Sequence, residues 1–496
     1  MVKAISEKVS RAFSEYVIVP REIKRDISPA DVSLESRLTA ELKIPLPFLG
    51  AAMRSVTGPD LATAIALQGG LGVLPRTEEQ IDYVKKVKRF KAGFVTNLIA
   101  VSPDEEINIL LEREGQYGYS TFPVVENKKL VGLITEKFYH PEHDLRRKVY
   151  ERMLPLERLV TAKESITLSE ANERMFESKI GVLPVVDAEG NLVSMVFMKD
   201  YKLSKVQYPN QFVNEEDKRL RVGAAISTHP EDRERAEALI KAGVDVLFID
   251  ASQGYSEYQK DTLRDLKKIK ERLGCDTPII GGNVVDEDGF KSLADSGCDG
   301  IKVGQGIGTA CTTLQVKGTG RGQATAIAEC AEARDGYYKE TGRYIPICSD
   351  GSIKTTKDMA IAFALGADTV MMGGYFAGFA EAAGSLVNKR FRVISDEGKV
   401  SVILAPVKEY WGEASLRSRN LRRYGHGDQR TFVVEGEEGY VPYKGRLGEE
   451  LPKDVNTLRY ILSSNGCRTI PEFYKEAKLE LSSEAARGEE GVGIIL

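Results

Sequence analysis

The 496-residue sequence is poor in histidine, contains no paired cysteine motif and lacks a long apolar run, and each shortage excludes a class of protein. The 4 histidines include no pair at metal-ligand spacing, which argues against a zinc enzyme. The 6 cysteines form neither a CxxC pair nor a disulfide framework, so we expect free thiols in a reducing, cytoplasmic environment. No apolar stretch is long enough to span a membrane, and the N-terminal sequence MVKAISEKVSRAFSEY carries too many charges for a signal peptide.

A strong net charge is missing as well. The 69 basic and 73 acidic side chains leave a formal charge of −4, so there is no basic field to attract nucleic acid. The composition that remains, 42% hydrophobic and 29% charged, is that of an ordinary globular protein. At this length the chain can hold two or three domains and at least one large core.

Short apolar segments rich in β-branched residues recur along the chain, and each ends in small or polar residues before a helical pattern begins. The expected strands span residues 44–53, 69–75, 219–227, 244–252, 277–285, 300–306, 345–351 and 369–374. Continuous apolar strands that alternate with amphipathic helices indicate a parallel sheet whose outer face is covered. The pattern favours an α/β fold of the (β/α)₈ TIM-barrel type, with an open doubly wound sheet as the alternative.

An internal repeat interrupts this pattern between the second and third units. The segment 120–135, STFPVVENKKLVGLIT, matches the segment 181–197, GVLPVVDAEGNLVSMVF, in the order Pro-Val-Val, acidic residue, turn, Leu-Val and strand. We therefore divide the chain into a first part of the barrel (1–92), an inserted pair of repeats (93–210) and a second part of the barrel (211–496).

Each repeat resembles a cystathionine-β-synthase (CBS) module, and the insert would then be a tandem CBS, or Bateman, domain. The resemblance implies that the pair binds an adenine or guanine nucleotide and regulates its host enzyme. The match is partial, because the second copy keeps an acidic residue at Asp200 while the first reads TEKFY at the equivalent place. Nucleotide binding and a purely structural or assembly role both stay open.

The run IKVGQGIGTACTT presents one thiol, Cys311, in a loop with glycine at every second position (Gly304, Gly306 and Gly308). Glycines at this density allow the backbone to approach a ligand closely and leave N–H groups free to hold anions. A single thiol in such a loop indicates a nucleophile, since the thiolate is the attacking form. The alternative is a tight glycine turn with a bystander cysteine.

The other expected strands also end in polar or glycine-rich segments. These ends are Asp250-Ala251-Ser252-Gln253-Gly254, Gly281-Gly282-Asn283, Ser349-Asp350-Gly351-Ser352 and Gly373-Gly374-Tyr375. Active sites of such barrels lie at the C-terminal ends of the strands, and glycine-rich ends on the last two strands favour a substrate that bears a phosphate. Asp350 would then accept hydrogen bonds from ribose hydroxyls.

After the eighth strand the barrel pattern stops. The segment 408–443 carries a cluster of arginines, among them Arg417, Arg419, Arg422 and Arg423, followed by a hinge at Gly425 and Gly427. A basic, glycine-hinged segment of this length is typical of a mobile flap or of a solvated loop.

Together these motifs resemble the inosine 5′-monophosphate (IMP) dehydrogenase family over nearly the whole chain. The resemblance rests on the barrel with its inserted pair, on GQGIGTACTT, on KGTGRGQATA, on CSDGSI and on the arginine-rich segment. It implies NAD-dependent oxidation of IMP to xanthosine 5′-monophosphate in guanine nucleotide biosynthesis, by a homotetramer that binds potassium. In that reaction a cysteine thiolate attacks C2 of the purine, hydride leaves to NAD⁺, and water hydrolyses the resulting thioimidate.

The resemblance also implies roles for individual residues. The catalytic residues would be Cys311, Thr313, Arg423 and Tyr424. The substrate would be held by Met53, Thr309, Asp350, Gly351, Ser352, Gly373, Gly374, Tyr410, Glu413, Ala414 and Glu435. The nicotinamide half of NAD would contact Asp250, Ser252, Asn283, Gly304 and Gly306. Potassium would be bound by Gly306, Gly308 and Cys311, with Glu489, Glu490 and Gly491 of a neighbouring subunit.

Arg423 is assigned with Tyr424 to the activation of water, although a guanidinium is normally always protonated. A base role requires either a neutral arginine in the closed site or transfer of the proton through Tyr424 and Thr313. The alternative is that Arg423 only binds charge.

The sequence departs from the family pattern beside the thiol and around the expected phosphate. The departures are Ala251, Thr309, Ala310, Ser352 and Gly374. Two other functions remain as alternatives. One is a guanosine monophosphate (GMP) reductase, which we expect to lack both the insert and the Arg-Tyr flap, and the other is a catalytically inactive nucleotide sensor.

Overall fold

The computed structural model describes residues 8–88, 90, 93–96, 98–117, 120–198, 211–214, 219–394, 400–420 and 433–488. The chain divides into two compact units. The first consists of Met1–Val87, Asn210–Phe212 and Arg221–Leu496, and the second of Lys88–Pro209 and Val213–Leu220.

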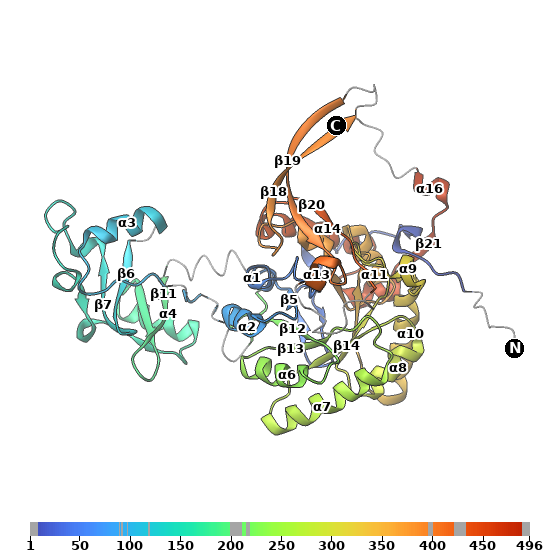
Figure 1. Cartoon of the computed structure of the whole chain (residues 1–496), viewed down its shortest axis with the longest axis horizontal. Coiled ribbons are helices and arrows are strands. Elements are labelled where there is room, and N and C mark those ends of the chain that lie inside the picture. The colour runs from blue at the N-terminus through green and yellow to red at the C-terminus, as the bar shows by residue number, and fades with distance from the viewer. Residues whose placement is uncertain are drawn as a thin grey trace. The chain divides into compact units, whose positions relative to one another are not determined.

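Parallel strands of the first unit close into a barrel in the order β12-β13-β14-β15-β16-β17-β4-β5, the eight barrel strands of the described chain (Figure 1). Their bounds are β4 Phe48–Gly50, β5 Leu71–Leu74, β12 Gly223–Ile226, β13 Val246–Ile249, β14 Ile279–Val284, β15 Gly300–Val303, β16 Ile347–Asp350 and β17 Thr369–Met372. Each expected strand segment contains one of these strands. The prediction of a (β/α)₈ barrel is confirmed, and the open sheet is excluded because β17 pairs with β4.

Helices follow the strands and cover the outside of the barrel. They are α1 Pro59–Leu67, α2 Gln80–Lys88, α6 Asp232–Lys241, α7 Glu257–Leu273, α8 Glu287–Asp295, α10 Gln323–Thr341 and α11 Thr356–Ala364, with the short α9 Thr313–Lys317 and α12 Gly374–Ala377. The ends of α7 illustrate the local signals. The Ser256 hydroxyl accepts a hydrogen bond from the Gln259 N–H at the start, and Gly274 closes the helix in the left-handed conformation, at φ 62°.

Apolar side chains of the strands fill the barrel interior. Leu49, Phe248, Ile280 and Met371, from four different strands, belong to one buried cluster. Ile44 and Phe212 join it from segments that precede the strands β4 and β12. This packing leaves the opposite, C-terminal ends of the strands for the polar residues.

After β17 the chain leaves the barrel as a three-stranded antiparallel sheet. Its strands are β18 Leu386–Ile394, β19 Val400–Trp411 and β20 Glu438–Pro442, with the short helix α13 Leu416–Asn420 between the last two. The expected flap, 408–443, therefore begins inside a strand and not in a loop, and β20 forms part of it. Residues 421–432 lie outside the described residues.

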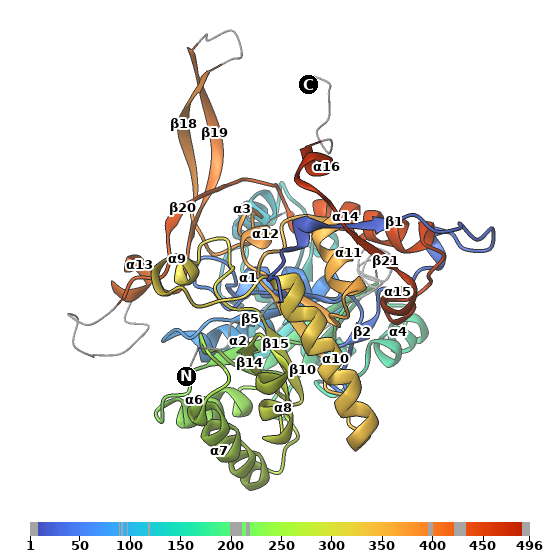
Figure 2. The same ribbon diagram turned by 90° about the vertical axis from the view of Figure 1, so that its right-hand side faces the viewer.

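Two strands from opposite parts of the described chain pair with each other in the barrel unit. Helices α14 Leu447–Ser464 and α15 Ile470–Glu476 follow the sheet, and then β21 Lys478–Leu481 and α16 Glu484–Gly488. Strand β21 pairs antiparallel with β1, Tyr16–Val19, as Figure 2 shows.

The second unit contains the two repeats as antiparallel hairpins. The first pairs β6 Thr121–Glu126 with β7 Lys129–Thr135, and the second pairs β10 Val182–Val186 with β11 Leu192–Phe197. The register shifts at the same place in both copies, between the two valines of the shared Pro-Val-Val sequence. The other strands and α-helices described in this unit are α3 Asn108–Tyr117, β8 Leu154–Pro155, β9 Ala162–Lys163 and α4 Leu168–Glu177. Asp200 lies outside the described residues.

Among the residues that the structure describes, no helix is both long enough and apolar enough to cross a membrane.

Candidate active site

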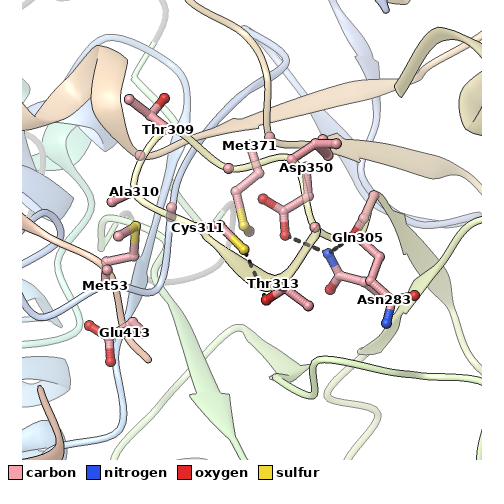
Figure 3. A pocket seen from close by; sticks show the side chains of 18 of the residues that line it. Met53, Asn283, Gln305, Thr309, Ala310, Cys311, Thr313, Asp350, Met371 and Glu413 are labelled. Carbon is pink, nitrogen blue, oxygen red and sulfur yellow. Dashed lines mark hydrogen bonds between the residues drawn. The ribbon is translucent and has the colours of Figure 1, made fainter. Parts of the chain in front are cut away.

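A cavity of about 330 Å³ opens at the C-terminal ends of the barrel strands (Figure 3). The site residues expected from the sequence and present in the described chain all line it. They are Met53, Asp250, Ser252, Asn283, Gly304, Gly306, Gly308, Thr309, Cys311, Thr313, Asp350, Gly351, Ser352, Gly373, Gly374, Tyr410, Glu413, Ala414 and Glu435. The expected residues Arg423, Tyr424, Glu489, Glu490 and Gly491 lie outside the described residues.

A chain of hydrogen bonds leads from the thiol to a carboxylate. The Cys311 Sγ donates to the Thr313 hydroxyl over 3.1 Å, and that hydroxyl donates to the Glu435 carboxylate over 2.7 Å. Lys317 Nζ lies 2.5 Å from the other oxygen of Glu435. The arrangement offers the thiol proton a route to a carboxylate whose charge is balanced by a lysine.

The environment of Cys311 differs from that of the buried cysteines. Burial raises the pKa of Cys348 to about 12, and it also raises the pKa of Cys298 and Cys330. Cys311 is only half-buried and faces the cavity. This contrast favours a nucleophile over a bystander cysteine, because the thiolate needs a polar, accessible environment.

Glu435 reaches the thiol from outside the barrel. It lies between α13 and β20, and its carbonyl oxygen accepts a hydrogen bond from the Thr312 N–H over 2.8 Å. The next turn adds a bond from the Glu437 N–H to the Ala310 carbonyl over 3.0 Å. The segment after the barrel is thus tied to the cysteine loop on both sides of Cys311.

Asp350 is held at the end of β16 by two donors. Asn283 Nδ2 donates to its carboxylate over 2.9 Å, and Lys302 Nζ over 3.2 Å. Lys302 also lies 3.8 Å from the Asp250 carboxylate. Burial lowers the pKa of Lys302, but the charges of Asp350 and Asp250 outweigh it, and the net pKa is raised. The lysine therefore stays charged between two carboxylates at the cavity floor.

Lys302 was missed in the sequence. It stands inside the apolar strand GIKVGQG and is only 3% exposed. A lysine in the middle of a buried strand is itself a signal, because a buried ammonium needs an acidic partner.

The departures from the family pattern are accommodated by local contacts. Ser352 adopts a left-handed conformation, φ 58°, and its hydroxyl donates to the Ile307 carbonyl of the cysteine loop over 2.8 Å. A Cβ added to Gly374 would lie 3.1 Å from the Thr309 hydroxyl oxygen. The larger residue at 309 therefore occupies the space that a side chain at 374 would need.

A second cavity, of about 460 Å³, shares Asp250, Ala251 and Ser252 with the first. Tyr255 and Tyr258 also line it, and Tyr258 is 74% exposed. These two tyrosines were not among the residues expected at the site. The sequence signal that could have identified them is a pair of aromatic residues shortly after the polar strand end at residues 250–254.

The histidines are not all isolated, which corrects one expectation from the sequence. On a turn of the second unit His140, Glu142 and His143 bring their donor atoms within 4.8 Å of one another. These exposed residues do not line the cavity that contains Cys311.

A family model for the "IMP dehydrogenase / GMP reductase domain" matches residues 10–492. The chain belongs to this family. It is 38% identical to the inosine-5′-monophosphate dehydrogenase of Tritrichomonas foetus over 97% of this chain and 95% of that protein. It is 35% identical to the enzyme of Escherichia coli with the same name, over 95% of this chain and 93% of that protein. Membership makes the chain an oxidoreductase of the IMP dehydrogenase / GMP reductase type.

Solved structures of the family include GMP reductases. One from Trypanosoma brucei, in complex with guanosine 5′-monophosphate, aligns with a TM-score of 0.82 and 28% identity over 99% of both chains. Another from the same organism, in complex with guanosine 5′-triphosphate, aligns with a TM-score of 0.72 and 25% identity over 96% of this chain and 99% of that one. The expectation that reductases lack the inserted segment is therefore wrong, because an alignment of this coverage includes it.

Proposed function

We propose that this family member is an IMP dehydrogenase, which oxidises IMP to xanthosine 5′-monophosphate with NAD⁺. The observation that carries the proposal is the chain of hydrogen bonds from Cys311 through Thr313 to Glu435 at the cavity, which Asp350 also lines. The names and the higher identities of the curated relatives also support it, at 38% against 28% for the solved reductase.

In this proposal IMP lies along the cysteine loop, with its ribose hydroxyls on Asp350. Gly351, Ser352, Gly373 and Gly374 hold the phosphate, together with Thr309 and the Tyr410 hydroxyl. The purine lies between Met53 and the segment of Glu413, Ala414 and Glu435. All of these positions line one cavity, which is the support for the assignment.

The residues on the other side of the cavity fit a nicotinamide. Both amide hydrogens of Asn283 are used, by the Gly304 carbonyl over 2.8 Å and by Asp350, so its side-chain oxygen can accept from a carboxamide. Asp250, Ser252 and Gly306 complete this subsite. The exposed ring of Tyr258 offers a stacking surface for the adenine at the far end. When bound, NAD⁺ supplies the acceptor for the hydride.

In the first half of the reaction the sulfur of Cys311 forms a bond to C2 of the purine as the hydride leaves C2. The thiol proton passes to the Thr313 hydroxyl, whose own proton passes to Glu435. Lys317 balances the carboxylate charge before the transfer. The result is a covalent thioimidate on Cys311.

In the second half a water oxygen attacks C2 and the bond between carbon and sulfur breaks, which releases xanthosine 5′-monophosphate and the thiolate. Water loses a proton in this step, and we assign its removal to Arg423 and Tyr424 with Thr313. Because a guanidinium cannot accept a proton, Arg423 must act either as a neutral base or by placing Tyr424 and the water.

The proposal extends to a bound cation, a subunit assembly and the second unit. Potassium would be bound by the carbonyls of Gly306, Gly308 and Cys311, oxygen ligands of the kind that an alkali cation takes, and by Glu489, Glu490 and Gly491 of a neighbouring subunit in a homotetramer. The second unit would be a tandem CBS pair that binds a regulatory nucleotide. The relative solved with guanosine 5′-triphosphate favours a guanine nucleotide. We expect the protein to act in the cytoplasm.

The test is to incubate the protein with IMP and NAD⁺ and to follow NADH absorbance, and in parallel to supply GMP and NADPH and follow ammonia. Production of NADH with no reaction of GMP supports a dehydrogenase. Ammonia release from GMP would identify a reductase, the second candidate that the T. brucei structures favour. Absence of both reactions would point to an inactive sensor.

A further inference from the structure

The first helical turn of α10 is capped by the N-terminal end of the described chain. The helix begins after Gly322, which offers no capping side chain. Ser10 Oγ accepts a hydrogen bond from the Gly322 N–H over 2.6 Å, and the Arg11 carbonyl accepts from the Ala324 N–H over 3.1 Å. These are N–H groups that a helix cannot satisfy internally, so the segment 8–12 supplies a cap from a distant part of the sequence.

The contact depends on the absence of a side chain at one position. A Cβ added to Gly322 would lie 2.4 to 2.7 Å from the carbonyl oxygen, carbonyl carbon and nitrogen of Arg11. Two further contacts hold the segment against α10, since the Arg11 N–H donates to the Thr325 hydroxyl over 2.8 Å and Lys8 pairs with Glu329 over 3.2 Å.

The capped turn lies directly against the loop that leads to Cys311. The Arg321 N–H donates to the Gln305 carbonyl over 3.3 Å. A Cβ added to Gly306 would lie 2.7 Å from the Thr319 carbonyl oxygen, so the two glycine-rich loops touch backbone to backbone. Gln323, the first residue of α10, also donates to the carbonyl of Val303, the last residue of β15, over 2.8 Å.

An ion pair between Arg321 and Glu329 also holds the first turn of α10. Arg321 pairs with Glu329 over 2.8 Å and donates to the Val285 carbonyl after β14 over 2.8 Å. The hydrogen bond from Arg321 lowers the pKa of Glu329 to about 2, and Lys8 adds to the effect. The pair therefore stays charged throughout the range in which an enzyme works.

We propose that the N-terminal segment 8–12 is a positioning element for the loop that carries Cys311. By closing the first turn of α10 it holds residues 318–323, and these hold Gln305 and Gly306. The segment is anchored at its other end, since β1 follows it and pairs with β21. The catalytic consequence rests on the proposed function, whereas the positioning of the loop does not.

The experiment compares the parent with Gly322→Ala, with chains that lack residues 1–11 or only residues 1–7, and with Ser10→Ala and Ser10→Thr. Gly322 has an ordinary backbone conformation, φ −58°, so alanine there disturbs the crossing and not the backbone itself. Hydrogen exchange of residues 304–322 and the rate at which iodoacetamide alkylates Cys311 report on the loop without any assumption about the reaction.

We expect exchange in 304–322 to become about tenfold faster in Gly322→Ala and after removal of residues 1–11. Ser10→Ala should show a smaller effect of about threefold, and Ser10→Thr should restore the parent rate. Removal of residues 1–7 is the matched control and should leave the exchange unchanged. Alkylation of Cys311 should change in the same order, and kcat should fall while the KM for NAD⁺ changes little.

The decisive comparison is Gly322→Ala made in the chain without residues 1–11. Since the clash partner is then absent, the substitution should have no further effect on exchange or alkylation. Unchanged exchange in 304–322 in the folded variants would overturn the proposal. If the parent shows no NADH formation, the proposed function fails, but the exchange data still decide whether the segment positions the loop.

Discussion

The cavity is built from two regions that differ in how they are constructed. The barrel wall consists of short buried strands. It contributes Asn283 from β14 and Asp350 from β16, and it contributes the thiol from the loop that follows β15. The excursion, the chain from β18 to β20, consists of long strands with a mostly exposed outer part, and it contributes Tyr410, Glu413 and Glu435. The two regions are joined at Cys311 itself, through an antiparallel bridge with Gly436.

The difference indicates a division of labour. A group that forms and holds a covalent bond must stay in place. On the barrel wall Cys311 is hydrogen-bonded to Thr313, and Asp350 accepts hydrogen bonds from Asn283 and Lys302. The pair assigned to water activation, Arg423 and Tyr424, belongs to the excursion, and Glu435 of the excursion receives the thiol proton through Thr313. If this division is correct, substitution of Cys311 on the wall should abolish the first step, whereas substitution of Arg423 or Tyr424 on the excursion should slow only the second step.

The largest effect is expected for Cys311→Ala. With no sulfur to attack C2, NADH formation should disappear completely, while IMP binding measured by calorimetry should remain, because the binding groups are untouched. Cys275→Ala, a half-buried cysteine that does not line the cavity, is the matched control and should keep full activity. NADH formation by Cys311→Ala would mean that the wall does not supply the nucleophile.

The next effect is expected for Arg423→Ala on the excursion. A rapid burst of NADH, about one per active site, should persist, because the first step does not use Arg423. Steady-state turnover should fall about a hundredfold or more, and a covalent adduct on Cys311 should accumulate and be visible by mass spectrometry. Loss of the burst would break the division between wall and excursion.

The barrel wall could be predicted from the sequence because buried parallel strands are continuous apolar runs, and their polar ends are visible by contrast. Lys302 was not predicted as a site residue, because it stands inside such an apolar run. The strands of the excursion were not predicted, because their burial pattern gives no signal. Residues 400–404 are all exposed, so β19 has no alternation of buried and exposed positions there. Glu413 and Glu435 were found only through the family resemblance, since nothing in their surroundings marks them.

The hairpins of the second unit were visible in the sequence because the repeat supplied two examples of one pattern. The capping of α10 by Ser10 could not be predicted. It joins residues more than 300 positions apart, and a serine near a chain end has no local signal for a helix that begins so far away.

A smaller effect on the wall is expected for Lys302→Met. The substitution leaves Asp350 and Asp250 without their shared cation, so the two carboxylates should repel each other and be held less firmly, although Asn283 still donates to Asp350. We expect KM to rise about tenfold for both IMP and NAD⁺, with a smaller change in kcat. Lys43→Met, which removes an exposed lysine paired with Glu35, serves as the control for loss of a lysine. An unchanged KM for both substrates would contradict a role for Lys302 in holding the cavity floor.

The smallest effect is expected for the packing of residue 374 against Thr309, at the part of the wall that would hold the phosphate. In Gly374→Ala the new Cβ would press on Thr309, and we expect the KM for IMP to rise about threefold. Thr309→Ser alone should change little. In the double variant serine can turn its single hydroxyl away, which branched threonine cannot do, so the effect of Gly374→Ala should largely disappear. Additive effects on the KM for IMP in this double-mutant cycle would show that residues 309 and 374 do not compensate each other. Each residue would then affect phosphate binding independently.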